Sequence, residues 1–398
     1  MEAVSKSSGR IPSLDGIRAL SILLVLLGHQ AYTAGALIPQ RWWTDYYAIQ
    51  GVRIFFILSG YLISTLLLRE REKTGKVDLK QFYIRRAYRI LPVAYLYLVV
   101  LTILFHNVLR PGELLKAFTY LSSYEFNPHW SVSHLWSLSV EEQFYFIWPL
   151  AVATGLVMSR RFAWAAIILS PLCRFVLDKT GHTYEALWFP PAVADSLASG
   201  CLLALYQPKL QRFRSFFTWK GFPLIWIGTL SIPFLTHYLD IYGQGSALWP
   251  LPQIAVRAGI TLFNLGIVLC IQNGIIDPPR ILNHPAVVWF GVLSYSFYIW
   301  HMPFFDSDVH SWATTFPTNV VLSLLVATLS FYGFEQPFLR LREQRAKSRF
   351  KPRPSPQLQL YPRHGLEGPD ENARPPEPRS PDPAKTRSSL LAPPEESA

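Results

Sequence analysis

Cysteine is scarce in this sequence. It has three cysteines among 398 residues, and all of them lie within apolar stretches, at Cys173, Cys201 and Cys270. This usage favours neither a framework of disulfides nor a thiolate metal site. The sequence also lacks a glycine-rich phosphate loop, a cluster with metal-ligand spacing and a nucleic-acid-binding motif. We therefore predict that the protein holds no metal and binds no nucleic acid.

Long apolar runs, by contrast, are abundant. Hydrophobic residues make up 50% of the sequence, and they form continuous runs rather than the one-sided pattern of soluble helices. A helix needs about 20 such residues to cross a bilayer, so we expect about ten spans and an all-α fold, a polytopic transmembrane helix bundle. The expected spans lie near residues 17–38, 49–68, 90–108, 141–158, 162–178, 188–206, 221–239, 253–272, 286–305 and 315–335.

Basic residues cluster in alternate loops between these spans. The formal net charge is +11, and the loop at residues 69–89 holds eight Lys and Arg residues, whereas the loops at 39–50 and 109–140 hold few. Loops rich in Lys and Arg stay on the cytoplasmic side. Carrying this parity along the chain places both termini in the cytoplasm. We expect an integral, multi-pass protein of the cytoplasmic or plasma membrane, with the lipid bilayer as its partner.

The composition changes near residue 340. The segment 351–398 contains 12 of the 32 prolines and few large apolar residues. We expect residues 1–340 to form the transmembrane domain and residues 341–398 a disordered, Pro-rich cytoplasmic tail. The alternative for the tail is that its Pro-rich runs bind a partner as an extended helix.

The first expected span also has features of a secretory signal. A basic start, an apolar core at 19–27 and small residues at 34–36 fit such a signal. Cleavage there would remove His29. We expect the span to be retained, because motifs in the later spans need a first helix to complete the set.

Two ionisable residues of the first span share one helix face. Arg18 and His29 are eleven residues apart, which is close to three turns and roughly 16 Å along a helix. A buried imidazole that titrates near working pH is suited to act as a general base. For Arg18 the alternative is a side chain that reaches to the headgroups, and for His29 it is a hydrogen-bonded core histidine.

Six short sequence blocks follow one another along the chain in a characteristic order. The first runs from Arg18 through ten residues to His29, and the second is FFILSGYLI at 55–63. The others are FYIRRAYRILP at 82–92, WSLSVEEQFY at 136–145, SYSFYIWHMP at 294–303 and EQP at 335–337. Together they resemble the motifs of the membrane-bound acyltransferase-3 family and cover nearly all of residues 11–340. The resemblance implies an acyltransferase domain at 1–340 that O-acylates sugars or other hydroxyl acceptors, and it implies that the matching His, Arg and Glu are required.

Three arginines stand at the expected cytoplasmic end of the third span. Arg85, Arg86 and Arg89 could hold the phosphates of an acyl-CoA donor, acetyl-CoA above all, because guanidinium groups bind phosphate bidentately. The alternative is a basic stop signal or a contact with anionic lipid.

Two adjacent carboxylates open the fourth expected span. Glu141 and Glu142 point about 100° apart on a helix, so only one need face the interior. Glu141 matches the family position and shares a face with Tyr145, so we expect it to orient His29 and stabilise its imidazolium. The alternative for one of the pair is a favourable interaction with the helix amino end.

Further polar residues fall inside later spans. Tyr298 and His301 could position the acceptor hydroxyl, with structural hydrogen bonding as the alternative for each. Arg174 and Asp195 reach a similar depth, and we expect them to form a structural ion pair.

We predict from these features a membrane-bound O-acyltransferase. It would move an acetyl or other short acyl group from acyl-CoA to a hydroxyl of a sugar or cell-envelope glycan. His29 would act as general base or as acyl carrier, with Arg18 stabilising charge. The alternative is a proton-coupled transporter, since intramembrane His, Arg and Glu also suit that function.

Overall fold

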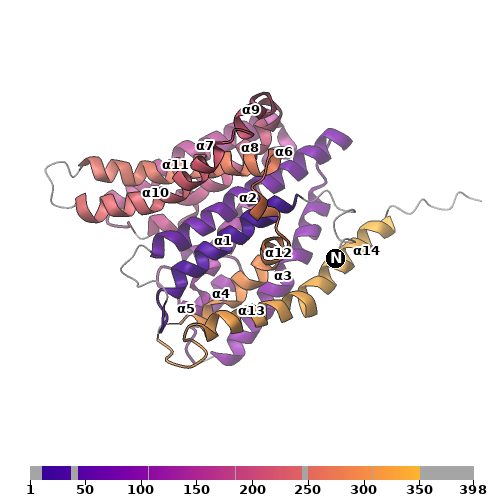
Figure 1. Ribbon diagram of the computed structural model, residues 1–398. Helices are drawn as coiled ribbons and strands as arrows, with labels where there is room; N and C mark the ends of the chain where they lie inside the picture. The colour runs from indigo at the N-terminus through magenta and orange to yellow at the C-terminus, as the bar shows by residue number, and fades with distance from the viewer. Residues whose placement is uncertain are drawn as a thin grey trace, which may run out of the picture. The chain divides into compact units, whose positions relative to one another are not determined.

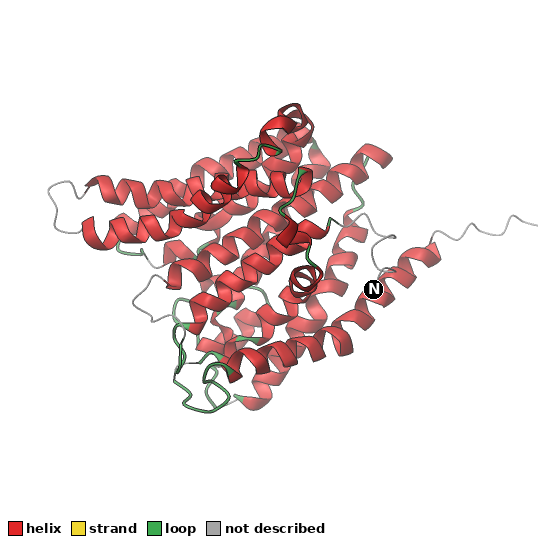
Figure 2. Cartoon of the chain, in the orientation of Figure 1, coloured by secondary structure: helices red, strands yellow, loops and turns green. Residues whose placement is uncertain are grey.

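The computed structural model describes residues 11–36, 44–105, 107–183, 185–243, 250–306 and 308–349. Within these ranges the regular structure is helical, and Figure 2 shows no strand among them. The long helices are α1 (Pro12–Gln30), α2 (Thr44–Thr74), α3 (Leu79–Leu104), α6 (Leu135–Thr154), α7 (Leu156–Lys179), α8 (Pro190–Leu210), α10 (Phe222–Gly243), α11 (Pro250–Ile276), α12 (Pro285–Trp300) and α13 (Thr318–Ser330). Shorter elements are α4 (Pro111–Phe118), α5 (Trp130–Ser133), α9 (Arg214–Phe217), the π-helical turn η7 (Phe331–Glu335) and α14 (Gln336–Arg349).

Each expected span coincides with one of these long helices, and the all-α polytopic bundle is confirmed. Seven helical segments of the described chain are long and apolar enough to cross a membrane. Two shorter apolar helices, Phe222–Thr236 and Pro285–Trp300, coincide with two further expected spans. The number of crossings and the side on which the termini lie remain predictions.

Local sequence signals begin several of the helices. Pro12, Pro190 and Pro285 stand in the first turns of α1, α8 and α12. Proline suits that place because its fixed φ is already helical and no N–H is lost from the helix ladder. Asp78 caps α3, accepting a hydrogen bond of 2.9 Å from the backbone N–H of Gln81.

The basic segment expected as a loop at 69–89 is mostly helical. Helix α2 continues to Thr74 and α3 begins at Leu79, so only four residues separate the two helices. Hydropathy finds where apolar residues stop, whereas a helix continues beyond that point as long as its backbone hydrogen bonds are satisfied. The arginines of this segment therefore have defined directions on helix faces.

The central helices pack closely through small residues. Helix α2 runs beside α1 and α8, α1 runs beside α12, and α10 pairs with α11 (Figure 1). A Cβ added to Gly60 or to Gly200 would overlap a backbone oxygen of the facing helix, Leu197 O or Ile57 O. Such close contact is typical of helices that associate in membranes, where apolar burial alone gives little driving force.

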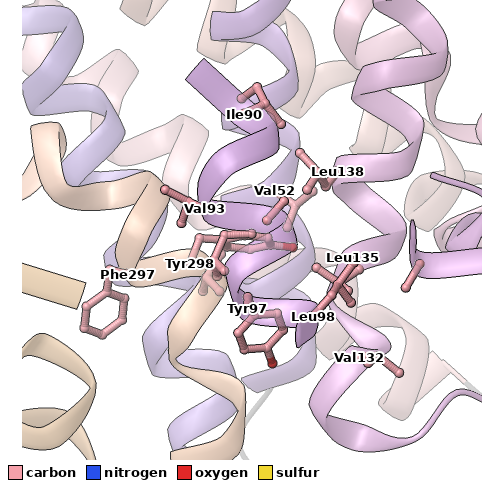
Figure 3. Packing of buried hydrophobic residues seen from close by; sticks show 14 of the residues in the cluster. Val52, Ile90, Val93, Tyr97, Leu98, Val132, Leu135, Leu138, Phe297 and Tyr298 are labelled. Carbon is pink, nitrogen blue, oxygen red and sulfur yellow. The ribbon is translucent and has the colours of Figure 1, made fainter. Parts of the chain in front are cut away.

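Apolar side chains cover both the inside and the outside of the bundle. A buried cluster from α1, α2, α3, α6 and α12 includes Val52, Val93, Leu138 and Tyr298 (Figure 3). Large apolar side chains also point outward, including Ile103 at 68% exposed, Phe146 at 67% and Ile168 at 66%. Together with the long apolar helices, this apolar exterior is that of an integral, multi-pass membrane protein.

Helix α14 extends past the expected domain boundary at residue 340, ending at Arg349. The remainder of the expected tail, residues 350–398, lies outside the described residues.

Candidate active site

A cavity of about 100 Å³ lies between α1, α2, α3, α6, α12 and η7. Its charged lining consists of Arg18, Arg86, Arg89, Glu141 and Glu335. The structure thus brings together four of the charged residues that the sequence pointed to, from α1, α3 and α6. Charged groups gathered between membrane helices are costly, and they mark a functional site.

Arg86 is held by both glutamates of α6. Its Nε donates to Glu142 Oε1 at 3.2 Å, its Nη2 lies 3.7 Å from Glu141 Oε2, and its guanidinium carbon lies 3.4 Å from the ring centroid of Tyr145. Ser59 of α2 donates to Glu141 Oε1 at 2.6 Å. These contacts satisfy Glu141 from two helices and fix its position at the cavity wall.

The alternative for one glutamate, an interaction with the amino end of the fourth span, is wrong. Helix α6 begins at Leu135, so Glu141 and Glu142 lie in its second turn rather than at its start. The apolar residues before the glutamates already belong to the helix. Both carboxylates instead form ion pairs with Arg86.

The three arginines of α3 have different surroundings. Arg85 points outward and pairs with Glu70 at 3.2 Å, with its side chain 47% exposed. Arg86 is bound to the glutamates, while Arg89 lines the cavity and makes no hydrogen bond or ion pair with any described residue. Arg89 is therefore the arginine of this group with donors available for an anion. Arg18, also in the lining, lies 3.6 Å from Asp15.

His29 belongs to a second group of residues, the histidine group, which lies further along α1 than the cavity. Its Nδ1 lies 2.8 Å from Nε2 of His301, and its ring lies 5.8 Å from that of Trp130. Nδ1 of His301 is 2.7 Å from the backbone oxygen of Tyr298. His134 completes the group, with its ring centroid 5.5 Å from that of His301. No group of three or more His, Cys, Asp or Glu among the described residues is arranged to hold a metal ion.

The expected contact between His29 and Glu141 is therefore not the one that the structure forms. Glu141 lines the cavity beside Arg18, and His29 lies three turns, roughly 16 Å, further along α1. Sequence reasoning placed His29 and Glu141 at one depth because it started the fourth span six residues too late. His301 occupies the place beside His29 that was expected for the carboxylate.

Tyr298 lies between the two groups. It lines the cavity, and its ring centroid is 5.7 Å from that of His301. Its hydroxyl donates to the backbone oxygen of His134 at 2.9 Å and lies 2.5 Å from Ser137 Oγ. Figure 3 shows the side chain projecting from α12 into the middle of the buried cluster. The Tyr298 side chain thus separates the charged cavity from the histidines.

Two functional candidates were not assigned a role from the sequence. Glu335 ends the π-helical turn η7, lines the cavity and accepts a hydrogen bond of 2.6 Å from Ser296. Its signal was its place in the EQP block, and π-turns often mark functional sites. His134 gave no sequence signal beyond its position two residues before the WSLSVEEQFY block.

A separate ionic cluster lies between α2, α7 and α8. Arg174 donates to Asp195 Oδ2 at 2.8 Å, which confirms the expected ion pair. Arg53 also lies 3.5 Å from the same carboxylate and donates to Ser196 Oγ at 3.0 Å. Two cations therefore share one buried anion. The sequence reasoning did not single out Arg53, although it is a charge within the second expected span, and its partner could not be identified without the fold.

Comparison with known proteins gives a consistent result. The acyltransferase-3 model, described as an Acyltransferase domain, matches residues 11–334. The peptidoglycan O-acetyltransferase OatA of Listeria monocytogenes is 30% identical over 368 residues, covering 82% of this chain and 55% of that protein. YrhL of Bacillus subtilis, named as a candidate peptidoglycan O-acetyltransferase, is 29% identical over 365 residues, covering 82% and 54%. A candidate O-acetyltransferase of Staphylococcus aureus is 28% identical over 366 residues, covering 82% and 57%.

The chain spans about half the length of these curated relatives. No solved structure is significantly similar to it. The family match covers the cavity lining apart from Glu335, the histidine group and every helix from α1 to α13. The chain is an integral membrane protein that belongs to the acyltransferase-3 family.

Proposed function

We propose that this acyltransferase moves an acetyl or other short acyl group from acyl-CoA, with acetyl-CoA as the expected donor, to a hydroxyl of a cell-envelope glycan. The observation that carries the proposal is the division of the site by Tyr298. A charged cavity lies on one side of this side chain, and a pair of hydrogen-bonded histidines lies on the other. A donor held by its phosphates and an acceptor held at an imidazole need two such regions.

The cavity suits the phosphate end of the donor. Its volume is about 100 Å³, below the roughly 300–1,000 Å³ of pockets that enclose a drug-sized ligand, so it is too small for the whole of coenzyme A. Arg89 has free donors there, and Arg18 adds a second guanidinium, so phosphate oxygens find charge-assisted hydrogen bonds. The bulk of the nucleotide binds outside, near the exposed Arg85.

The pantetheine arm then passes Tyr298 to bring the thioester to His29. His29 takes the proton of the acceptor hydroxyl, the oxygen attacks the thioester carbon, and the carbon–sulfur bond breaks. The released thiolate receives the proton from the imidazolium, so the charges balance. Because the Tyr298 side chain lies between the cavity and the histidines, binding of the donor moves this side chain aside.

The relatives support a glycan as the acceptor. OatA and YrhL carry peptidoglycan in their names, and the similarity extends over 82% of this chain. Trp130 lies beside His29, with Tyr32 5.6 Å from Trp130, so the base stands next to aromatic rings. A polysaccharide acceptor would meet these rings before it reaches the imidazole.

The test is release of free CoA thiol from acetyl-CoA by detergent-purified protein, with and without cell-envelope glycan fragments. We expect release by the wild type, loss of release in His29→Ala, and normal release in His284→Ala. The control changes an exposed histidine at the start of α12 that belongs neither to the cavity lining nor to the histidine group. Absence of release from folded wild type would contradict the proposal, and solute flux into liposomes would then point to transport.

The same assay separates the general base from the acyl carrier. If His29 carries the acyl group, mixing enzyme with acetyl-CoA alone gives a burst of one thiol per protein. If the hydroxyl attacks the thioester directly, thiol appears only when acceptor is present.

A further inference from the structure

The histidine pair has a defined order of donors and acceptors. Nδ1 of His301 lies 2.7 Å from the backbone oxygen of Tyr298, and its Nε2 lies 2.8 Å from Nδ1 of His29. A carbonyl oxygen only accepts hydrogen bonds, so Nδ1 of His301 carries a hydrogen. A neutral imidazole has one N–H, which leaves Nε2 of His301 as an acceptor. Nδ1 of His29 must therefore donate, and Nε2 of His29 keeps its lone pair.

The rings are neutral because their surroundings offer no opposite charge. No carboxylate among the described residues hydrogen-bonds to His29, His134 or His301. A cationic imidazole in such a buried place would lack compensation. The carboxylates that the sequence placed nearby lie in the cavity instead, bound to Arg86 and Ser59.

We propose that His301 is a positioning residue that fixes the tautomer of His29, so that Nε2 of His29 is the nitrogen that takes the acceptor's proton. This inference rests on the proposed acyl transfer. It gives an imidazole and a backbone carbonyl the orienting role that a carboxylate has in a Ser-His-Asp triad. When His29 takes the proton, its Nδ1–H still donates to His301, so the new charge meets an acceptor already in place.

The surroundings of His301 hold its ring in this orientation. The side chain is 0% exposed. Its ring stacks on Phe297 with centroids 6.0 Å apart and planes at 15°, and Phe305 closes another side at 5.8 Å. The backbone N–H of His301 donates to the oxygen of Phe297 at the end of α12. A ring packed in this way keeps Nε2 directed at His29.

Two substitutions of His301 distinguish its role as a hydrogen-bond acceptor from the effect of losing its ring. In His301→Gln the amide oxygen can still accept from Nδ1 of His29. In His301→Asn the shorter side chain reaches the Tyr298 carbonyl but not His29. We expect kcat of thiol release to fall by about 10²-fold or more in His301→Asn, and to stay within about tenfold of wild type in His301→Gln, with KM for acetyl-CoA unchanged in both.

The tautomer itself gives a second readout that needs no variant of His301. In wild-type protein with ¹⁵N-labelled histidine, the signals that His29→Ala removes should show a protonated Nδ1 and an unprotonated Nε2. The opposite tautomer would overturn the inference, as would full kcat in His301→Asn. Either result, with His29-dependent release intact, would leave the proposed acyl transfer standing. Release that does not depend on His29 would instead refute the proposed function.

Discussion

Arg86 lies over the ring of Tyr145, with its guanidinium carbon 3.4 Å from the ring centroid. The contact fixes Arg86 between two carboxylates, while Arg89, one turn further along α3, makes no ion pair within the described chain. The two arginines of one motif thus have different roles. Arg86 is bound within the wall of the cavity, and the guanidinium of Arg89 faces the interior of the cavity.

Because of this difference, we expect alanine substitutions of the two arginines to affect different properties of the protein. Arg86→Ala leaves Glu141 and Glu142 buried without their cation, which should destabilise the fold by about 3–5 kcal/mol. Arg89→Ala breaks no ion pair, so it should leave the melting temperature nearly unchanged and raise KM for acetyl-CoA. Thermal unfolding in detergent and thiol-release kinetics measure both. A large loss of stability in Arg89→Ala with an unchanged KM would contradict the assignment.

The shared carboxylate of Asp195 should be essential for folding. Asp195→Asn leaves Arg53 and Arg174 as two buried cations without an anion, and we expect a loss of about 3–5 kcal/mol. The matched control is Asp277→Asn, at an exposed position after α11, which should change stability by less than about 0.5 kcal/mol. Equal melting temperatures for the two variants would show that the cluster is not needed for stability.

The crossing of α2 and α8 requires glycine at its contact. Gly200→Ala would place a methyl group against the backbone oxygen of Ile57, and overpacking of this kind costs about 1–3 kcal/mol. Gly228 in α10 has open space around its Cβ position, so Gly228→Ala should be neutral or stabilise by up to about 1 kcal/mol. Thermal unfolding of both variants measures the difference in stability. A lower melting temperature for Gly228→Ala than for Gly200→Ala would contradict the prediction.

Glu113 should make stability depend on pH in the acid range. Its burial would raise the pKa of the carboxyl, but hydrogen bonds from the Arg110 side chain and from the backbone N–H groups of Arg110 and His129 outweigh burial, and the pKa is lowered below its ordinary value of 4.5. A lowered pKa in the folded state contributes stability above the unfolded value, and this stability is lost as pH falls through the folded value.

We therefore expect the melting temperature of the wild type to fall more steeply than that of Glu113→Gln as pH drops below 4.5. At pH 7 the wild type should be the more stable of the two. Parallel melting curves across this range would mean that Glu113 does not contribute to the acid sensitivity.

The sequence predicted the helices well because membrane helices are marked by long apolar runs. Each of the ten expected segments coincides with a helix, and the ion pair of Arg174 with Asp195 followed from the high cost of charges in a bilayer. Helix ends were less accurate, since α6 begins at Leu135 rather than at Glu141. Polar residues at the end of an apolar run do not end a helix whose backbone remains bonded.

That error also explains why the partner of His29 was missed. Starting the fourth span too late moved Glu141 toward His29, whereas the structure places it in the cavity with Arg18. The contact of His29 with His301 joins residues 272 positions apart. Periodicity fixes which face of a helix carries a residue, but the angle and depth at which α1 meets α12 depend on close packing, as at Gly291, whose Cβ position is taken by the backbone of Asp15.

The placement of Tyr298 has a consequence for the membrane as a whole. Its hydroxyl is tied to His134 and Ser137, and its ring closes the cavity below the histidines. In the proposed reaction the Tyr298 side chain would fill the path before the donor binds, and the donor's own pantetheine arm would fill it afterwards. In the proposed reaction an acyl group would then reach the acceptor without a continuous opening for protons, so turnover would leave the cell's proton-motive force intact.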